Sequence, residues 1–338
     1  MTPGLMVDPT LATLWAFIIA FAVFAYVVMD GFDLGIGVLF PTFEAGPERD
    51  RTMNSIAPVW DGNETWLILG GGGLFAAFPL AYAVILPATY PLVIAMLLGL
   101  VFRGVAFEFR WRDNRHRGFW DVAFCGGSIV AAMAQGMILG ALLQGIRVAD
   151  RAYSGSWWDW LTPYTLLTGL GTLAGYALLG ATWLVWKLDG EGQAHARKLA
   201  RRAFLATTAL LVAVSLYNLV LRPEYAAKWL AAPGIYFAAP IPLAAGVLGA
   251  LLLRALPRGE AAPFWLSLGM FACGMAGLGL TIWPNVVPPA LTIWDAAAPA
   301  RSQAFMVVGF GITMPLILGY TAWAYWVFRG KVDHEGYH

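Results

Sequence analysis

Long apolar runs separated by short polar stretches dominate this sequence. A run of about 20 apolar residues is long enough for a helix to cross a hydrocarbon core of roughly 30 Å. The pattern therefore predicts an all-α, polytopic membrane protein with about nine transmembrane helices, folded as a single integral membrane domain over residues 1–338. The nine runs occupy approximately residues 12–40, 54–77, 80–106, 120–143, 163–186, 203–221, 236–253, 263–283 and 303–328.

The run over residues 54–77 fits this pattern least well, because it carries two acids and four consecutive glycines. Each glycine weakens a helix by about 1 kcal/mol. If all nine runs span, 16 of the 21 Lys and Arg residues fall on one face of the membrane, and without this run only 14 do. Because basic residues collect on the cytoplasmic side of short loops, the sharper split predicts nine spans, with the N-terminus outside and the C-terminus cytoplasmic.

The composition supports a membrane protein and excludes other classes. With 59% hydrophobic residues, 12% charged residues and a mean hydropathy of +0.67, the chain is too apolar for a soluble domain. A net charge of +1 argues against nucleic acid as a partner. Cys125 and Cys273 fall inside apolar runs, where cysteine behaves as a small hydrophobic residue, so no disulfide framework is expected.

Four acids lie inside the first two apolar runs, neither of which contains a Lys or Arg. Asp30 and Asp33 belong to the first run, and Asp61 and Glu64 to the second. An unneutralised carboxylate in hydrocarbon costs roughly 2.5 kcal/mol or more. Buried acids without cations therefore indicate proton handling, in which carboxyl groups serve as stations between water and a buried reaction centre.

Helical geometry places these acids close together. Each pair is spaced i, i+3 and so shares one helix face. Asp30 lies about 27 Å from the outer end of its run, and Asp61 lies about 12 Å from the cytoplasmic start of the next, so both fall in the inner half of the membrane. Gly31 and Gly35, one turn apart beside the first pair, predict a close approach of another backbone.

Other interpretations of these polar residues remain open. The acids could cap helix ends, bond backbone amides or lie exposed at the membrane interface, and Asp61 is the most open to this, because carboxylates are favoured near a helix start. Arg103, Glu108 and Arg110 are expected to form a solvated charge cluster or, as the alternative, the mouth of a proton path. Most tryptophans fit an interfacial belt, whereas Trp66 flanks the acids.

Histidines are missing from the apolar runs. A membrane haem normally needs axial histidine, and a catalytic metal needs clustered His, Cys or carboxylate ligands. We therefore expect no haem ligands, no metal site and no catalytic residue in this chain. The four histidines lie in polar loops or the C-terminal tail, at His116, His195, His334 and His338.

Three motifs together resemble subunit II of cytochrome bd-type quinol oxidases, and they cover about the first third of the chain. They are MDGFDLGIG from Met29, NSIAPVWDGNETWLILGGGGLFAAFPLAYA from Asn54 and FRGVAFEFR from Phe102. The resemblance implies a respiratory complex of the bacterial cytoplasmic (inner) membrane that oxidises quinol and reduces oxygen to water. In such a complex subunit I carries the quinol site and haems b and d, and subunit II is its haem-free partner.

The same resemblance implies an architecture and residue roles. We expect two four-helix bundles plus a peripheral helix, with chemical protons drawn from the cytoplasm. Asp61 matches a cytoplasmic-side gate, Asp30 a relay station, Trp66 a neighbouring motif position and Glu108 a position near the entrance. Some members have Gln in place of Glu64, which leaves open whether Glu64 transfers protons. The candidate proton-path residues are Asp61, Asp30, Asp33, Glu64, Trp66 and Glu108.

The expected partners are the haem-bearing subunit I, quinol and oxygen as substrates of the complex, and membrane lipid. Small single-helix subunits, and a structural quinone or lipid in this chain, are further candidates. One alternative function is a proton-coupled secondary transporter, in which Gly70–Gly73 would form an unwound substrate site. A second alternative is a purely structural scaffold for the partner. The motifs do not separate the bd from the cyanide-insensitive branch.

Overall fold

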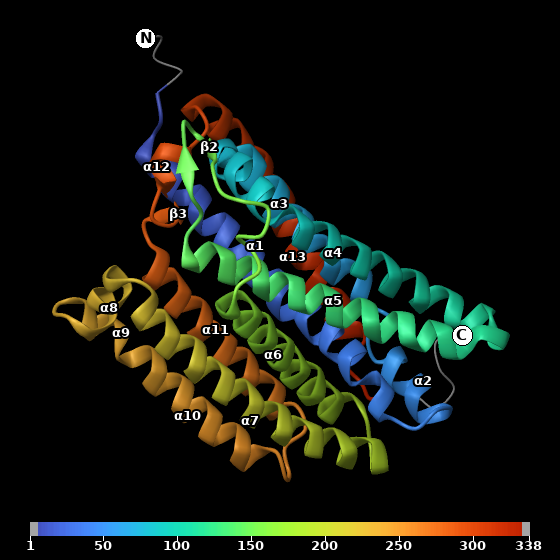
Figure 1. The fold of residues 1–338 in the computed structure, drawn as a ribbon. Helices are drawn as coiled ribbons and strands as arrows, with labels where there is room; N and C mark the ends of the chain where they lie inside the picture. Colours follow the sequence, from blue (N-terminus) through green and yellow to red (C-terminus); the bar gives the residue numbers. More distant parts are fainter. Residues whose placement is uncertain (1–5, 333–338) are drawn as a thin grey trace.

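Helices make up most of the chain in the computed structural model, which describes residues 6–332 (Figure 1). The helices are α1 Pro9–Leu39, α2 Pro47–Asn54, α3 Trp60–Ala77, α4 Pro79–Arg112, α5 Arg117–Gln144, α6 Pro163–Lys187, α7 Gly190–Leu221, α8 Pro223–Leu230, α9 Gly234–Ala238, α10 Pro240–Ala255, α11 Ala262–Ile282, α12 Ile293–Ala296 and α13 Ala300–Val327, with 3-10 turns η1 Phe40–Thr42 and η2 Asn114–His116. Two small antiparallel hairpins pair β1 Val148–Ala149 with β2 Ala152–Tyr153, and β3 Asn285–Val287 with β4 Leu291–Thr292.

The predicted all-α membrane fold is confirmed. Within the described residues, eight helical segments are long and apolar enough to cross a membrane, and each coincides with one of the predicted runs. The ninth predicted run corresponds to α3, an 18-residue helix whose acids and glycines make it less apolar. Ala77, the last residue of α3, accepts a hydrogen bond from the backbone of Ala298, and nearby Ala300 bonds Met6 beside the N-terminus. The chain therefore returns along α3 to the end where α1 begins.

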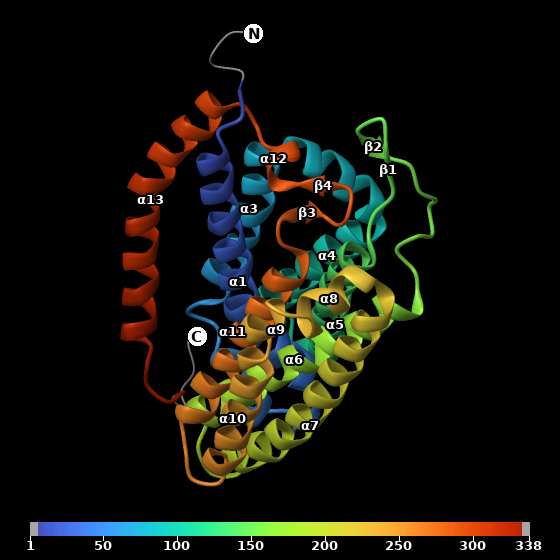
Figure 2. The ribbon, with the colours of Figure 1, turned by 90° about the vertical axis from the view of Figure 1, so that its left-hand side faces the viewer.

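The spanning helices form the predicted two bundles. The first contains α1, α3, α4 and α5, and the second contains α6, α7, α10 and α11 (Figure 1). The bundles meet where α6 packs along α1. The remaining long helix, α13, runs along one edge of the molecule beside α1 and α3 (Figure 2).

The start of the second predicted span is wrong by several residues. A separate helix, α2, ends at Asn54, turns follow, and α3 begins only at Trp60. Pro58 explains the break, because proline lacks an N–H and disfavours helical geometry at the residue before it. Asp61 consequently lies in the first turn of α3 instead of two turns inside the helix. The helix continues unbroken through Gly70–Gly73, so the unwound substrate site of the transporter hypothesis is absent from this segment.

Glycines set the contact between the two bundles, as the sequence predicted for Gly31 and Gly35. A Cβ atom at Gly35 would overlap the carbonyl oxygen of Tyr176 on α6, and one at Gly180 would overlap the backbone of Gly35. A Cβ atom at Gly31 would lie 2.8 Å from the ring of Tyr176. Only glycine lets the backbones approach this closely, and the crossing lies beside Asp30 and Asp33 on α1.

Polar contacts fasten α13 at both ends. Near its start, the buried side chain of Gln303 donates to the carbonyl of Ala77, and the main-chain carbonyl of Gln303 accepts from the indole of Trp15. Past its end, the Lys187 ammonium at the end of α6 donates to the carbonyls of Phe328 and Gly330. Between these anchors α13 buries few side chains.

We call the end of the molecule that holds α2 and η2 the α2 end; the N-terminus lies at the other end (Figures 1 and 2).

Candidate functional site

Two of the candidate acids are completely enclosed. Asp30 and Asp33 are each 0% exposed, within a stretch of α1 in which every residue from 30 to 37 is buried. This part of α1 packs against α3, α5 and α6. Burying an ionised carboxylate costs several kcal/mol unless charges or hydrogen bonds compensate it, so the surroundings of these acids determine what they can do.

A buried arginine on α4 lies between the acids. The Arg103 side chain is 1% exposed, and its Nη1 lies 3.5 Å from Asp30 Oδ1 and 3.6 Å from Glu64 Oε2. The expectation of acids without cations is therefore wrong for Asp30 and Glu64. The expected solvated cluster around Arg103 and Arg110 is also wrong, since Arg110 is equally buried. The physical reason is that α4 continues to Arg112, which carries both arginines inside the bundle.

The acids of α3 connect this site to the surface. Glu64 is partly open, with 28% of its side chain exposed, and it completes the group that we call the acid site: Asp30, Asp33, Glu64 and Arg103. Asp61, one turn earlier on α3, is exposed and has no ion pair within residues 6–332. The two helices thus bring their acids together at comparable depth, as the sequence predicted, with Asp61 at the outer edge of the group.

Hydrogen bonds tie Asp33 to two other helices. Asn63 of α3, 1% exposed, donates from Nδ2 to Asp33 Oδ2 at 2.7 Å. The hydroxyl of Tyr325 on α13 donates to Asn63 Oδ1 at 2.8 Å. Sequence reasoning missed both residues. Asn63 stands between Asp61 and Glu64 in the motif and could have been noticed there, whereas nothing in the sequence connects Tyr325 to the acids.

A second polar chain runs beside Asp30. The Tyr176 hydroxyl on α6 donates to Gln135 Oε1 on α5, and Gln135 Nε2 donates to the hydroxyl of Tyr26 on α1, both at 2.7 Å. Tyr26 precedes Asp30 by four residues and so lies on the same face of α1. The chain fixes α1, α5 and α6 to one another next to the acid site.

Besides Asp61, two of the six candidate residues are not part of the acid site. Trp66 is 4% exposed and packs edge-on against Phe21 of α1, in a small apolar cluster that also contains Tyr26 and Met314. Glu108 is exposed on α4, five residues beyond Arg103, and forms no ion pair with the described residues. A role for either in proton transfer stays a prediction.

Several buried polar atoms of the acid site have no partner. Both carboxylate oxygens of Asp30, Oδ1 of Asp33 and all three guanidinium nitrogens of Arg103 are buried without a hydrogen-bond partner among the described residues. Buried polar atoms are almost always hydrogen-bonded, to protein or to ordered water. The site therefore combines three carboxyl groups and one cation with polar atoms that remain available to water or to a transferred proton.

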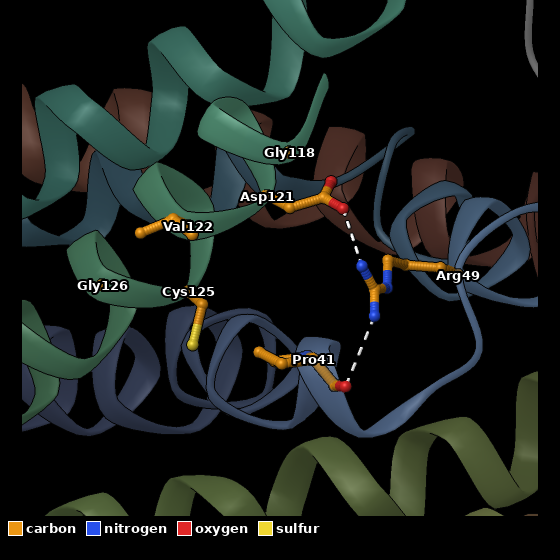
Figure 3. Close-up of a pocket in the computed structure, with 7 residues that line it drawn as sticks. All are labelled: Pro41, Arg49, Gly118, Asp121, Val122, Cys125 and Gly126. Carbon is orange, nitrogen blue, oxygen red and sulfur yellow. Dashed lines mark hydrogen bonds and ion pairs between the residues drawn. The ribbon is translucent and has the colours of Figure 1, made fainter. Parts of the chain in front are cut away.

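A second polar cluster lies at the α2 end, between α2, α4 and α5. Its members are joined by close ion pairs: Arg110 with Asp50 and Asp121, Arg49 with Asp121 at 2.8 Å, and Arg117 with Asp50 at 2.8 Å. We call these five residues the α2-end cluster. Figure 3 shows Arg49 and Asp121 beside a hollow of about 310 Å³, whose other lining residues are Pro41, Gly118, Val122, Cys125 and Gly126.

Comparison with known proteins decides the family. A family model described as cytochrome bd terminal oxidase subunit II matches residues 11–328. The chain belongs to this family. The resemblance carried by three motifs in the first third is thus confirmed, and it extends over nearly the whole sequence.

Relatives in this family match along their full length. Cytochrome bd-I ubiquinol oxidase subunit 2 of Escherichia coli (strain K12) is 30% identical over 372 residues, which cover 98% of this chain and 97% of the relative. Cytochrome bd ubiquinol oxidase subunit 2 of Bacillus subtilis (strain 168) is 28% identical, with 96% and 98% covered. The structure of bd oxidase from Geobacillus thermodenitrificans has the same fold, with a TM-score of 0.77 at 18% identity over 94% of this chain and 98% of that one.

As a bd oxidase subunit II, the chain is part of a quinol oxidase complex, a multi-pass protein of the inner membrane with a subunit I as partner. Neither histidine within the described residues is buried. Within residues 6–332, His116 pairs with Asp113 in the loop after α4, and His195 contacts Thr42 near the α2 end; His334 and His338 lie outside the described residues. The same range contains no group of three His, Cys, Asp or Glu side chains placed to hold a metal.

Proposed function

We propose that this subunit II holds no haem of its own and passes protons from the cytoplasm toward the oxygen-reducing site of subunit I. One observation carries the proposal: the acid site holds three carboxyl groups around a single cation and opens to the surface through Glu64. With more acids than cations in a buried, hydrated group, protons offset the excess charge, and protons held in this way can move.

The chain's own residues supply a sequence of positions for the proton. Asp61, exposed in the first turn of α3, receives it at the surface. Glu64, one turn further on the same face, passes it inward. Water bound among the unpartnered atoms of Asp30, Asp33 and Arg103 connects Glu64 with the two enclosed acids. From there the proton leaves for the partner, whose haems would reduce the oxygen.

Arg103 changes the mechanism that the sequence suggested. A guanidinium keeps its protons under all ordinary conditions, so Arg103 is not a carrier. It holds Asp30 and Glu64 on either side of itself and offsets one of up to three negative charges. The transferable protons then belong to the acids that the single cation leaves uncompensated. The distances of 3.5 and 3.6 Å exceed those of direct hydrogen bonds, so Arg103 does not block the oxygens that take up a proton.

The wider assignment follows the family and the charge pattern. We propose that subunit I carries haems b and d and the quinol site, and that the arginine-rich α2 end faces the cytoplasm with the N-terminus outside. Small single-helix subunits, and a structural quinone or lipid bound to this chain, stay predictions.

Replacement of Asp61 tests the function directly. In the purified complex, Asp61→Asn is expected to lower quinol-driven oxygen consumption about tenfold or more, with the haem content of the wild type, because the first proton acceptor is lost while the enclosed acids stay intact. Asp150→Asn is the matched control, since Asp150 is an exposed acid in the turn between β1 and β2. Wild-type turnover in the Asp61 variant would contradict the proposal.

One observation also favours a scaffold role. Arg103 on α4 bridges acids on α1 and α3, so the acid site joins three helices of the first bundle. If that is its purpose, Asp30→Asn and Glu64→Gln should each reduce the amount of assembled complex while every assembled complex turns over normally. Variants that assemble with full haem content and turn over slowly support proton transfer instead.

A further inference from the structure

Asn63 is held in one orientation by groups on three sides. Its Nδ2 donates to Asp33 Oδ2 at 2.7 Å and also faces the carbonyl oxygen of Met29 at 3.4 Å. Its Oδ1 accepts from the hydroxyl of Tyr325 at 2.8 Å. The side chain is 1% exposed, so it has no room to exchange these partners for bulk water.

The Met29 carbonyl decides which way the amide points. A main-chain carbonyl can only accept hydrogen bonds. If the Asn63 amide were flipped, its oxygen would face the Met29 oxygen, and two acceptors would repel each other. The orientation with Nδ2 toward Met29 and Asp33 is therefore the stable one, and Tyr325 completes it by donating to the remaining oxygen.

This orientation assigns different roles to the two oxygens of Asp33. Oδ2 accepts the Asn63 N–H and so cannot carry a proton on that side. Oδ1 is buried and has no hydrogen-bond partner among the described residues. Arg103 pairs with Asp30 and Glu64, and Asp33 forms no ion pair in residues 6–332. Charge balance in a group of three carboxyl groups and one cation calls for two protons, and Asp33, which has no ion pair, is the acid that holds one of them, with Oδ1 the atom that bears it.

We propose that Asn63 is a positioning residue that reserves Oδ1 of Asp33 as the proton-carrying atom and that Tyr325 holds Asn63 in place. This rests on the proposed function, since it names the atom through which one station of the path works. It also gives α13 a role in the acid site. That helix is fastened at its ends and buries few side chains, and Tyr325 links it through Asn63 to Asp33.

Infrared spectroscopy of the purified complex tests the assignment, because a protonated carboxyl group has a C=O band that shifts in D2O. Asp33→Asn is expected to remove one such band from the H2O-minus-D2O difference spectrum. In Asn63→Leu the same band is expected at higher wavenumber, because the carbonyl oxygen Oδ2 has lost its donor. Tyr325→Phe is expected to move it less and in the same direction. Tyr320→Phe on the same helix, at a residue 77% exposed, is the control and should leave it unmoved.

Two results would overturn the proposal. A band that stays in place in Asn63→Leu means that Asn63 does not bond the carbonyl oxygen, and the absence of any band lost in Asp33→Asn means that Asp33 carries no proton. If Asn63→Leu does not assemble, Tyr325→Phe takes its place, and a C=O band that stays at its wild-type wavenumber in that variant overturns the proposal. Oxygen consumption of Asp61→Asn separates the two proposals: wild-type turnover there together with a shifted band here refutes the proton path and leaves the assignment of Oδ1 standing.

Discussion

The acid site and the α2-end cluster both combine arginines with acidic residues, but they differ in the ratio of the two and in the lengths of the ion pairs. In the α2-end cluster, three arginines meet two aspartates, and the ion pairs Arg110–Asp50, Arg49–Asp121 and Arg117–Asp50 are 2.8–2.9 Å long. In the acid site, one arginine lies 3.5 Å from Asp30 and 3.6 Å from Glu64 without a hydrogen bond to either, and Asp33 has no ion pair among the described residues. The first group has an excess of cations and is closely bonded, and the second has an excess of acids and is loosely bonded.

This difference separates structural from chemical use of charge. Short pairs, hydrogen-bonded between Arg49 or Arg110 and Asp121 and between Arg117 and Asp50, hold the charges in one fixed geometry and so join α2, α4 and α5. Wider pairs leave oxygens available to water and protons. Proximity of acids and arginines alone therefore does not indicate a proton path; the distances and the ratio of acids to cations do.

The largest effect is expected from Arg103→Leu. This change leaves three carboxyl groups buried without a cation, and removing one partner of a buried ion pair costs about 3–5 kcal/mol. We expect little assembled complex, measured as haem-containing complex per membrane protein. Arg103→Lys keeps the charge and should restore assembly in part. Normal assembly of the leucine variant would show that the acid site is fully protonated and needs no cation.

A smaller effect is expected from Arg110→Met in the α2-end cluster. The arginine is buried, but Asp121 keeps Arg49 and Asp50 keeps Arg117, so the loss is that of hydrogen bonds to charged groups, about 2 kcal/mol. Thermal unfolding should begin at lower temperature while oxygen consumption per haem stays unchanged. Slow turnover in fully assembled Arg110→Met would erase the distinction between the two groups.

Glu64→Gln reduces the excess of acids without removing the side chain. The acid site would then hold two carboxyl groups and one cation, so stability is expected to stay equal or rise by about 1 kcal/mol. If Glu64 is a proton station, oxygen consumption falls, whereas if it serves only as a hydrogen-bonding group, turnover stays within about twofold of the wild type. Stopped-flow measurement of oxygen reduction distinguishes the two outcomes, and Glu191→Gln, an exposed acid in the first turn of α7, is the control.

The smallest effect is expected from Asp113→Asn, outside the membrane-spanning helices. Hydrogen bonding by His116, with a further contribution from Trp120, holds the pKa of the Asp113 carboxyl below its usual value. A lowered pKa in the folded state stabilises the protein at pH values above the unfolded pKa of about 3.9. This stabilisation is lost as the pH falls through the pKa of the folded state. Thermal unfolding should therefore show a small difference between wild type and variant that is constant from about pH 5 to 8 and disappears in stronger acid.

The sequence predicted the helices well because the bilayer imposes a simple rule on them. Length and apolarity locate a spanning helix without knowledge of its neighbours, so all nine runs have a counterpart in the structure. The error at α3 arose where apolarity does not decide, because the predicted run begins at Asn54 while Pro58 interrupts the helix. The glycine contact at Gly35 was predictable because it depends on one local pattern.

The acid site was only half predictable for a related reason. Acids within one helix, and on two consecutive helices, can be placed together from spacing alone. Arg103 and Tyr325 reach the site from α4 and α13, and which way they point depends on how those helices pack. An arginine inside the apolar stretch LVFRGVAF was nevertheless a usable signal, because a cation in such a stretch needs an anionic neighbour.

The glycine contact between the bundles has a mechanical consequence for proton transfer. Since Gly31 and Gly35 flank the buried aspartates and lie directly against Tyr176 and Gly180, α1 cannot roll or slide at this level without steric collision. Any gating motion in the subunit must then come from elements around a stationary α1, such as the first turn of α3 or the edge helix α13. The enclosed carboxyl groups therefore lie on a helix that stays in place, and movement is expected in the peripheral helices of the subunit.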